Sequence, residues 1–540
     1  MSGVTRSAGR MGLATLCSRV LGLVREQVFA FLFGASDATD AFNIAFRIPN
    51  LLRDLFAEGA MSAAFVPNFA RALVQSREAA FRLLIAVLSV LAFSLSILSV
   101  AGMVFAPGLV SFYADAYRAV HGKFELSVSL TRMMFPFFPL VAMAAVTMGA
   151  LNALGSFFLP AFAPVLFNVA SIACGLALTP LIRGYTAYPP IYSMAVGVVL
   201  GGFLQFYVQW RQMRRRGLEP RRFAGGFFRP WRVEGVKRVL WLLVPGTIGL
   251  AATQLNILVN SIYATSQGSG AVSWLNYAFR LMQFPIGIIG VSLAAATLPV
   301  VSKKLAMSDP AGAALDLNRS LRASFAVNAP AAAGLMVAGL PIIQMLFQHG
   351  RFGAEDSRQT AAALFWYALG LPGYSAVKIM VPAFYALGNT RFPVVVSFLS
   401  VALNAALNHV LLNVFHYPFW ALAAATSATA TLNAVLLALI LGRRLKGSLD
   451  VRLALSMGVH AALSAAVAAA AWLAIRGMDR FAPSFPRFAQ VSLAMLAGVG
   501  IWIALGRVFR VPEIDALVEF FIGKLKKDSR KAKSIGNMDS

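Results

Sequence analysis

Charged side chains lie inside the first two hydrophobic segments of this chain, and this feature most restricts how it can fold. The residues are Arg19, Arg25, Glu26, Asp40, Arg47, Arg53, Asp54 and Glu58. A charged side chain at the centre of a bilayer costs roughly 2.5–3.5 kcal/mol on insertion scales, so these groups must face one another and a water-filled cavity. Guanidinium groups bind phosphate in a bidentate way, and a cavity lined by arginines therefore predicts a phosphate-bearing substrate.

The rest of the sequence has the composition of a membrane protein. Of the 540 residues, 59% are hydrophobic and 13% are charged, whereas soluble domains carry about 25% charged residues. Continuous apolar runs of about 20 residues predict transmembrane helices and exclude an outer-membrane barrel, whose strands alternate. We therefore predict an all-α polytopic membrane protein with about fourteen helices. They are expected at residues 11–33, 40–70, 82–108, 128–152, 160–181, 189–210, 236–263, 271–301, 320–345, 360–387, 393–414, 419–442, 452–475 and 487–508.

Basic residues are concentrated in loops on one side of the predicted bundle. The net charge is +26, and residues 211–238 contain ten arginines and lysines against two glutamates. The positive-inside rule places this face, with both termini, in the cytoplasm. Anionic lipid headgroups are the expected partners of this charge, and the absence of any RNA- or DNA-binding motif argues against nucleic acid.

Three short matches at one common offset indicate an internal repeat. Residues 150–155 resemble 383–388, Pro160 corresponds to Pro393, and 45–47 correspond to 278–280. The offset spans six helices, so the two halves should be related by an axis along the membrane normal with a cleft between them. We predict an N-lobe at 1–210, a basic cytoplasmic linker at 211–235, a C-lobe at 236–445, two additional helices at 446–510 and a basic cytoplasmic tail at 511–540.

The second segment places four charged residues on one helical stripe. At about 100° per residue, Asp40, Arg47, Asp54 and Glu58 fall within about 20–40° of one another, with Arg53 to one side. One interpretation is a chain of internal ion pairs, such as Arg47 with Asp54, that neutralise each other. The other is a substrate site, which the excess of arginines over nearby acids favours once the first segment is included.

The remaining arginines have similar alternatives. Arg19 shares a helical face with Glu26, but it could also extend to the cytoplasmic interface, whereas Arg25 lies deeper. Arg280 repeats Arg47 in the second half and could face the same cleft. Its alternative role is a hydrogen bond to backbone released near Pro285.

A group of amide side chains is a candidate cation site. Asn404 and Asn408 share a helical face and, with Asn256 or Asn260 and Thr426, offer neutral oxygens suited to Na⁺. Hydrogen bonds between helices are the favoured alternative. No other metal site is expected. No catalytic arrangement or phosphate-binding loop is present, so we expect no enzyme activity and no ATP-driven step.

Several short sequences match a known family. They are Ser18-Arg19-Val20-Leu21-Gly22 with Arg25, Ala38-Thr39-Asp40-Ala41-Phe42, Pro49-Asn50-Leu51-Leu52-Arg53, Phe56-Ala57-Glu58-Gly59-Ala60, Ala64-Phe65-Val66-Pro67, Pro160-Ala161-Phe162-Ala163-Pro164, Ser273-Trp274, and Arg280-Leu281-Met282 with Phe284-Pro285. Over essentially all of the predicted helices the chain resembles the MurJ (MviN) lipid II flippases of the multidrug/oligosaccharidyl-lipid/polysaccharide exporter superfamily. The resemblance implies a two-lobed transporter of the bacterial inner membrane. It would move undecaprenyl-pyrophosphate-linked disaccharide pentapeptide (lipid II) from the cytoplasmic to the periplasmic leaflet.

The resemblance also implies roles for individual residues. Functionally important charged positions of the family correspond to Arg19, Arg25, Asp40, Arg53, Glu58 and Arg280. We expect an alternating-access cycle in which pyrophosphate is bound by Arg19, Arg25, Arg53 and Arg280, while the gating or charge partners are Asp40, Glu58, Arg47, Asp54 and Glu26. The two additional helices match a groove for the lipid tail, and some relatives bind sodium among their helices 7, 11 and 12. The chain departs from residues that relatives can carry at Asp54, Phe279, Gln283 and Asn408.

Two other transport functions remain open. One is a flippase for another polyprenyl-pyrophosphate-linked glycan, and the other is a cation-coupled multidrug exporter, against which the arginine excess argues. A membrane scaffold without transport is a third alternative. The expected energy source is the membrane potential or an ion gradient. The expected partners are lipid II, membrane lipids and cell-wall synthesis proteins. A monomer is sufficient for this architecture.

Overall fold

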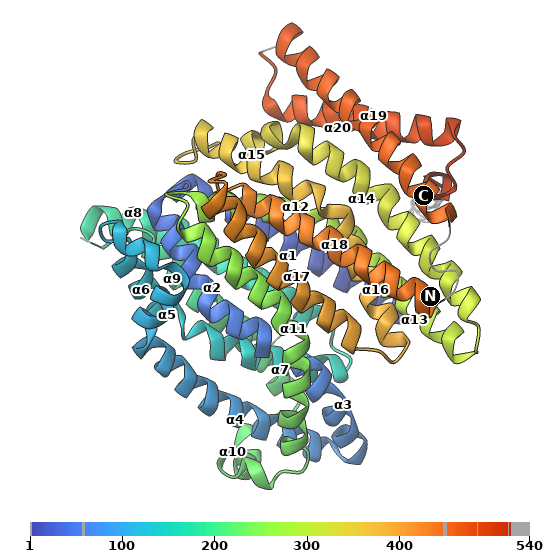
Figure 1. Ribbon diagram of the computed structural model, residues 1–540. Helices are drawn as coiled ribbons and strands as arrows, with labels where there is room; N and C mark the ends of the chain where they lie inside the picture. The colour runs from blue at the N-terminus through green and yellow to red at the C-terminus, as the bar shows by residue number, and fades with distance from the viewer. Residues whose placement is uncertain are drawn as a thin grey trace, which may run out of the picture. The chain divides into compact units, whose positions relative to one another are not determined.

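The chain folds into α-helices in the computed structural model, which describes residues 3–56, 60–186, 188–445, 451–482, 484–516 and 518–519 (Figure 1). No strand occurs among these residues, and the all-α prediction is confirmed. Nine of the described helices are long and apolar enough to cross a membrane, or ten if a pair bent by 45° counts as one span. The larger number of helices expected from the sequence stays a prediction.

The helices form two compact units, each described by itself. The first comprises Met1–Trp274 and Phe347–Asp356, and the second comprises Leu275–Leu346 and Ser357–Ser540. The helix over Val236–Thr265, which the repeat assigns to the second half, packs inside the first unit. The N-lobe and C-lobe that the internal repeat predicts, at residues 1–210 and 236–445, therefore stay a prediction.

The first unit consists mainly of long apolar helices. Its elements are α1 (Gly3–Phe33), α2 (Asp37–Phe56), α3 (Ala60–Gln75), α4 (Arg77–Val104), α5 (Ala106–Ala114), η1 (Asp115–Ala119), α6 (Lys123–Met134), α7 (Phe137–Ala153), α8 (Phe158–Tyr185), α9 (Tyr192–Arg215), η2 (Pro220–Phe223), α10 (Ala224–Phe228), η3 (Pro230–Arg232) and α11 (Val236–Thr265). The described parts of the helix expected at 40–70 are α2 and α3, on either side of residues 57–59, which lie outside the described residues. The helix expected at 128–152 is divided into α6 and α7. Pro136 lies between α6 and α7, where its missing N–H interrupts the helical hydrogen bonds.

The second unit continues from α12 (Ala271–Pro285), whose first turn belongs to the first unit. Its further elements are η4 (Ile286–Gly290), α13 (Val291–Ala306), α14 (Pro310–Phe347), α15 (Ala354–Leu369), α16 (Leu371–Ala386), α17 (Arg391–His409), η5 (Val410–Val414), α18 (Ala421–Arg444), α19 (Val451–Phe481) and α20 (Arg487–Val508). The pair bent by 45° is α15 and α16. α16 packs against α13 and α18, and α19 packs against α20.

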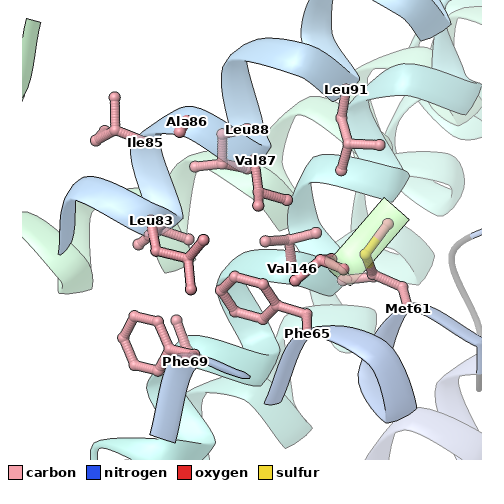
Figure 2. Packing of buried hydrophobic residues seen from close by; sticks show 14 of the residues in the cluster. Met61, Phe65, Phe69, Leu83, Ile85, Ala86, Val87, Leu88, Leu91 and Val146 are labelled. Carbon is pink, nitrogen blue, oxygen red and sulfur yellow. The ribbon is translucent and has the colours of Figure 1, made fainter. Parts of the chain in front are cut away.

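The hydrophobic core of the first unit lies where α3, α4 and α7 meet (Figure 2). Phe65 and Phe69 of α3 are fully buried, and their ring centroids lie 5.3 Å apart. They pack in one cluster with Leu83 and Val87 of α4 and Val146 of α7. Within a membrane, lipid tails are as apolar as these side chains, so close packing rather than water exclusion holds the helices together.

Glycines allow several of these helices to approach closely. A Cβ atom on Gly197 of α9 would lie 2.8 Å from the Cα of Ser171 in α8. A Cβ atom on Gly102 of α4 would lie 2.2 Å from the ring of Phe135, which is buried at the end of α6. Small residues at such positions are typical of helix contacts in membranes.

We predict that Gly102→Ala lowers the free energy of unfolding by about 1–3 kcal/mol, because the new methyl group overpacks the site beside Phe135. Thermal unfolding in detergent measures the effect. Gly108→Ala is the matched control, since nothing lies within 4 Å of the added atom. Equal unfolding temperatures for the two variants would contradict this description of the packing.

Candidate functional site

Arg25 of α1 pairs with the acid that follows it in the sequence. Its Nη2 lies 2.6 Å from Oε1 of Glu26, and its Cζ lies over the ring of Phe167 in α8 at 5.2 Å from the centroid. The side chain of Arg25 is 15% exposed. α1 is further held to α8 by Asn168, whose Nδ2 donates to the carbonyl oxygen of Ser18 at 3.0 Å. The guanidinium group is therefore oriented by a carboxylate and an aromatic face, and part of it stays accessible.

Arg53 of α2 forms a second pair of the same kind. Its Nε and Nη2 donate to Oδ1 of Asp54 at 3.0 and 2.5 Å. The other carboxylate oxygen, Oδ2, accepts from Nδ2 of Asn50 at 3.3 Å and from Nε2 of Gln254 in α11 at 3.2 Å. The Arg53 side chain is 25% exposed. The sequence offered Arg47 with Asp54 as one alternative, and the contacts of Asp54 described here are with Arg53, Asn50 and Gln254.

Arg47 contacts α11 about two turns further along. Its Nη1 donates to Oγ of Ser261 at 2.5 Å, and Ser261 donates to the carbonyl oxygen of Ile257 at 2.6 Å. Gln254 and Ser261 were not identified from the sequence, because polar residues occur at several positions of α11 and only its packing against α2 shows which of them contact the charged residues. Two polar residues of α11 thus contact the charged residues of α2.

Asp40 takes part in a different network, at the start of α2. Its side chain is fully buried. Oδ2 lies 3.1 Å from Nζ of Lys123 and accepts from the backbone N–H of Gly270 at 2.8 Å. Oδ1 accepts from the backbone N–H and the hydroxyl of Ser273 at 3.0 and 2.6 Å. The carboxylate thereby caps the N-terminus of α12, where unpaired N–H groups and the helix dipole favour an anion.

Lys123 connects this cap to α6. Its side chain is 2% exposed, and Nζ also lies 2.6 Å from Oδ1 of Asp37 and 4.2 Å from the centroid of the Tyr117 ring. Lys123 was not identified from the sequence, because a lone lysine ahead of an apolar segment resembles an ordinary interfacial residue. One buried cation thus joins two acids of α2 to the beginning of α6.

The α1–α2 turn also binds the segment 347–356 within the first unit. The N–H of Arg351 donates to the carbonyl oxygen of Phe31 at 3.0 Å. Gly34 and Gly350 adopt positive φ at this contact, and a Cβ atom on either would lie less than 3 Å from backbone oxygen. Nε1 of Trp274 donates to Oδ1 of Asp356 at 2.9 Å. These contacts and the Asp40 network hold together the same end of the unit.

The other expected charged residues are placed separately. Arg19 is exposed on α1, and Arg280 is exposed on the part of α12 that belongs to the second unit. Glu58 lies outside the described residues. The structure therefore brings Arg25 to Glu26 and Arg53 to Asp54, two of the acids expected as charge partners.

The expected sodium ligands form a hydrogen-bonded ladder in the second unit. Asn404 and Asn408 are fully buried, and Nδ2 of Asn408 donates to Oδ1 of Asn404 at 3.1 Å. Nδ2 of Asn404 lies 3.5 Å from the hydroxyl oxygens of both Thr426 and Thr429 in α18. Hydrogen bonds of this kind between helices are the alternative to a sodium site that the sequence analysis favoured. Among the described residues no group of three or more His, Cys, Asp or Glu could hold a metal.

The remaining expected ligand, Asn256, belongs to the first unit. Its Oδ1 accepts from Nδ2 of Asn260 at 3.1 Å. Sodium binding by Asn256, Asn404, Asn408 and Thr426 stays a prediction.

Comparison with known sequences gives one family. The family model described as "Lipid II flippase MurJ" matches residues 29–489. The chain is 39% identical over 431 residues to the "Lipid II flippase MurJ" of Burkholderia cenocepacia, covering 80% of this chain and 82% of the relative. It is 33% identical over 521 residues to the "Probable lipid II flippase MurJ" of Bdellovibrio bacteriovorus, covering 93% and 95%.

Solved structures show the same fold. A structure titled as lipid II flippase MurJ in an inward closed conformation matches with a TM-score of 0.76 at 23% identity, over 92% of this chain and 99% of that one. An inward-facing multidrug resistance MATE family transporter of the MOP superfamily matches with a TM-score of 0.64 at 15% identity, over 80% and 95%.

We predict that Lys123→Met lowers the free energy of unfolding by about 3–5 kcal/mol, because it leaves the Asp40 carboxylate buried without its cation. Asp40→Asn in the same chain should recover part of this loss. Thermal unfolding in detergent measures both.

Arg222→Met is the control for loss of an ion pair. Arg222 pairs with Glu78, and both side chains are more than half exposed, so the expected loss is about 0–1 kcal/mol. The buried-pair account is contradicted if Lys123→Met is no more destabilising than this control.

Proposed function

The chain belongs to the MurJ family of lipid II flippases, and from this membership we propose that it moves lipid II from the cytoplasmic to the periplasmic leaflet of a bacterial inner membrane by alternating access. The resemblance first noted in short motifs is confirmed by the family model and the relatives. The chain is a multi-pass membrane protein, and the proposal involves no covalent chemistry. One copy of the chain is sufficient for it.

The observation that carries the proposed mechanism is the pairing of Arg25 and Arg53 with adjacent acids. Each guanidinium is partly exposed and is bound to the carboxylate of the next residue in the chain. A pyrophosphate carries more negative charge than a carboxylate and offers more acceptor oxygens, so it can compete for the same donors. We propose that substrate displaces Glu26 and Asp54, and that this exchange supplies the difference in affinity that a change of state requires.

The proposed orientation follows from the distribution of charge. With the basic loops in the cytoplasm, the α1–α2 turn and the loop before α12 face the periplasm. The Asp40–Lys123 network and the contact of the turn with segment 347–356 then lie at the periplasmic end of the first unit. We propose that they close this end, and that passage of the substrate headgroup requires some of these contacts to part.

We propose that α19 and α20 hold the polyprenyl chain of the substrate, since they match the additional pair of helices in the family.

The proposed energy source is electrical. A negative interior favours outward movement of the anionic headgroup by about 2.3 kcal/mol per charge for each 100 mV. We propose the membrane potential as the driving force, with a sodium gradient as the alternative. Binding to cell-wall synthesis proteins is a further expectation of the family membership.

We expect Arg25→Ala to abolish exposure of lipid II at the periplasmic surface of cells depleted of their own flippase, because a donor to the pyrophosphate is lost. Chemical labelling of periplasmic lipid II measures exposure, at matched membrane levels of each variant. Arg222→Ala, which removes an exposed arginine, should act as wild type. Normal exposure in cells with Arg25→Ala would contradict the proposed role of this arginine.

Replacing ions distinguishes the membrane potential from a sodium gradient as the energy source. In vesicles with an imposed potential, we expect transport of lipid II to persist when Na⁺ is replaced by K⁺, and to fall when the potential is collapsed. Asn404→Ala should then lower stability without introducing any dependence on Na⁺, as expected of a hydrogen bond between helices. Transport that stops on removal of Na⁺ would instead support the amide group as a sodium site.

A further inference from the structure

The chain turns back on itself directly after α20. The N–H of Val511 donates to the carbonyl oxygen of Gly506 at 2.8 Å, and the N–H of Arg510 donates to that of Arg507 at 3.1 Å. Arg510 adopts a φ of 51°, which is the left-handed conformation that ends many helices. Residues 512–516 then form a short helical segment. We call residues 511–516 the C-terminal latch.

The C-terminal latch is packed against α19 and α20. Val511 and Ile514 are buried in one cluster with Leu463 of α19, and Trp502 of α20 packs against this cluster. A Cβ atom on Gly506 would lie 2.5 Å from Cδ1 of Ile514, so the latch lies close to the end of α20. The first residues of the predicted basic tail are therefore a folded part of the second unit.

Glu513 of the latch lies between cationic and polar groups of two other helices. Its Oε1 lies 3.7 Å from Nη1 of Arg322 in α14, and its Oε2 lies 3.8 Å from Nε2 of His460 in α19. The Glu513 side chain is 12% exposed and that of His460 is 1% exposed. Neither ring nitrogen of His460 has a hydrogen-bond partner among the described groups. A carboxylate in this position is attracted electrostatically to Arg322 on one side and faces the buried imidazole of His460 on the other.

We propose that Glu513 is a positioning residue for transport, which fixes the α19–α20 pair to α14 through Arg322 and so sets where that pair lies when it holds the polyprenyl chain. The inference rests on the proposed function, because it assigns the chain of the substrate to α19 and α20. Two observations support it independently: the latch is built onto the end of α20, and its acid reaches a cation on α14.

The charges explain why this contact restricts movement. Arg322 lies within α14, a helix long and apolar enough to span the membrane. The Arg322 side chain is 24% exposed, and the partly buried carboxylate of Glu513 supplies its counter-charge from the latch. Removing either partner leaves the other partly buried and unpaired, which favours separation of the latch from α14.

The test compares transport of two substrates by the full-length protein in proteoliposomes. One is lipid II with its undecaprenyl chain, and the other is an analogue with a short geranyl chain that cannot extend along α19 and α20. For Glu513→Gln and Arg322→Gln we expect a roughly five- to tenfold lower initial rate with the undecaprenyl substrate, at the low end of coupling between sites. The geranyl analogue should be moved at the wild-type rate by both variants.

Two matched variants separate charge pairing from loss of stability. Asp515→Asn removes the other acid of the latch and should leave both rates unchanged. The double variant Glu513→Arg with Arg322→Glu restores opposite charges and should recover most of the rate with the undecaprenyl substrate. Equal losses with both substrates, or wild-type rates for Glu513→Gln, would overturn the inference.

A distance measurement keeps this test independent of the proposed function. Spin labels at exposed Leu315 of α14 and Val508 of α20, with both native cysteines replaced, report the distance between the helices. We expect a narrow distribution in wild type and Asp515→Asn, and a broad one in Glu513→Gln. If the distribution broadens but wild type moves neither substrate, the anchoring stands and the proposed function fails. If it does not broaden, the inference is overturned whatever the transport rates.

Discussion

A charge that enters the membrane must find its counter-charge within the protein, and the described structure depends on how this requirement is met. The cost of an unpaired charge at the bilayer centre is roughly 2.5–3.5 kcal/mol on insertion scales. Arg25 and Arg53 meet the requirement with the next residue in the chain, whereas Lys123 meets it with acids from another helix. The distance along the sequence between partners therefore decides what each pair can do.

Pairs between adjacent residues can open without separating helices. Glu26 and Asp54 can release Arg25 and Arg53 to a phosphate group while α1 and α2 stay in place. The buried pair of Asp40 with Lys123 behaves differently, because the same carboxylate also caps α12 and so joins three elements. Substrate exchange at the first kind of pair and closure at the second are thereby assigned to separate groups, which is what a transporter with two states needs.

The sequence predicts the fold class and the charged segments well, but it leaves open which acid each arginine contacts. Hydrophobic runs indicate membrane helices directly, and the arginines are evident because they interrupt those runs. The helical stripe offered Arg47 with Asp54 as one possible pair, and it did not single out the contact of Arg53 with the adjacent Asp54 carboxylate. Lys123 and Glu513 were missed because each is a single charge near a helix end, and only packing of distant segments shows what it contacts.

The measurement that tests the central claim most directly is the rate at which purified protein moves lipid II across the membrane of proteoliposomes. We predict that wild type transfers labelled lipid II well above the rate of protein-free vesicles. The double variant Arg25→Gln with Arg53→Gln should fall to the protein-free rate while its thermal unfolding shows that it remains folded. If this double variant moves lipid II as fast as wild type, arginine pairs exchanging carboxylate for pyrophosphate are not the basis of transport.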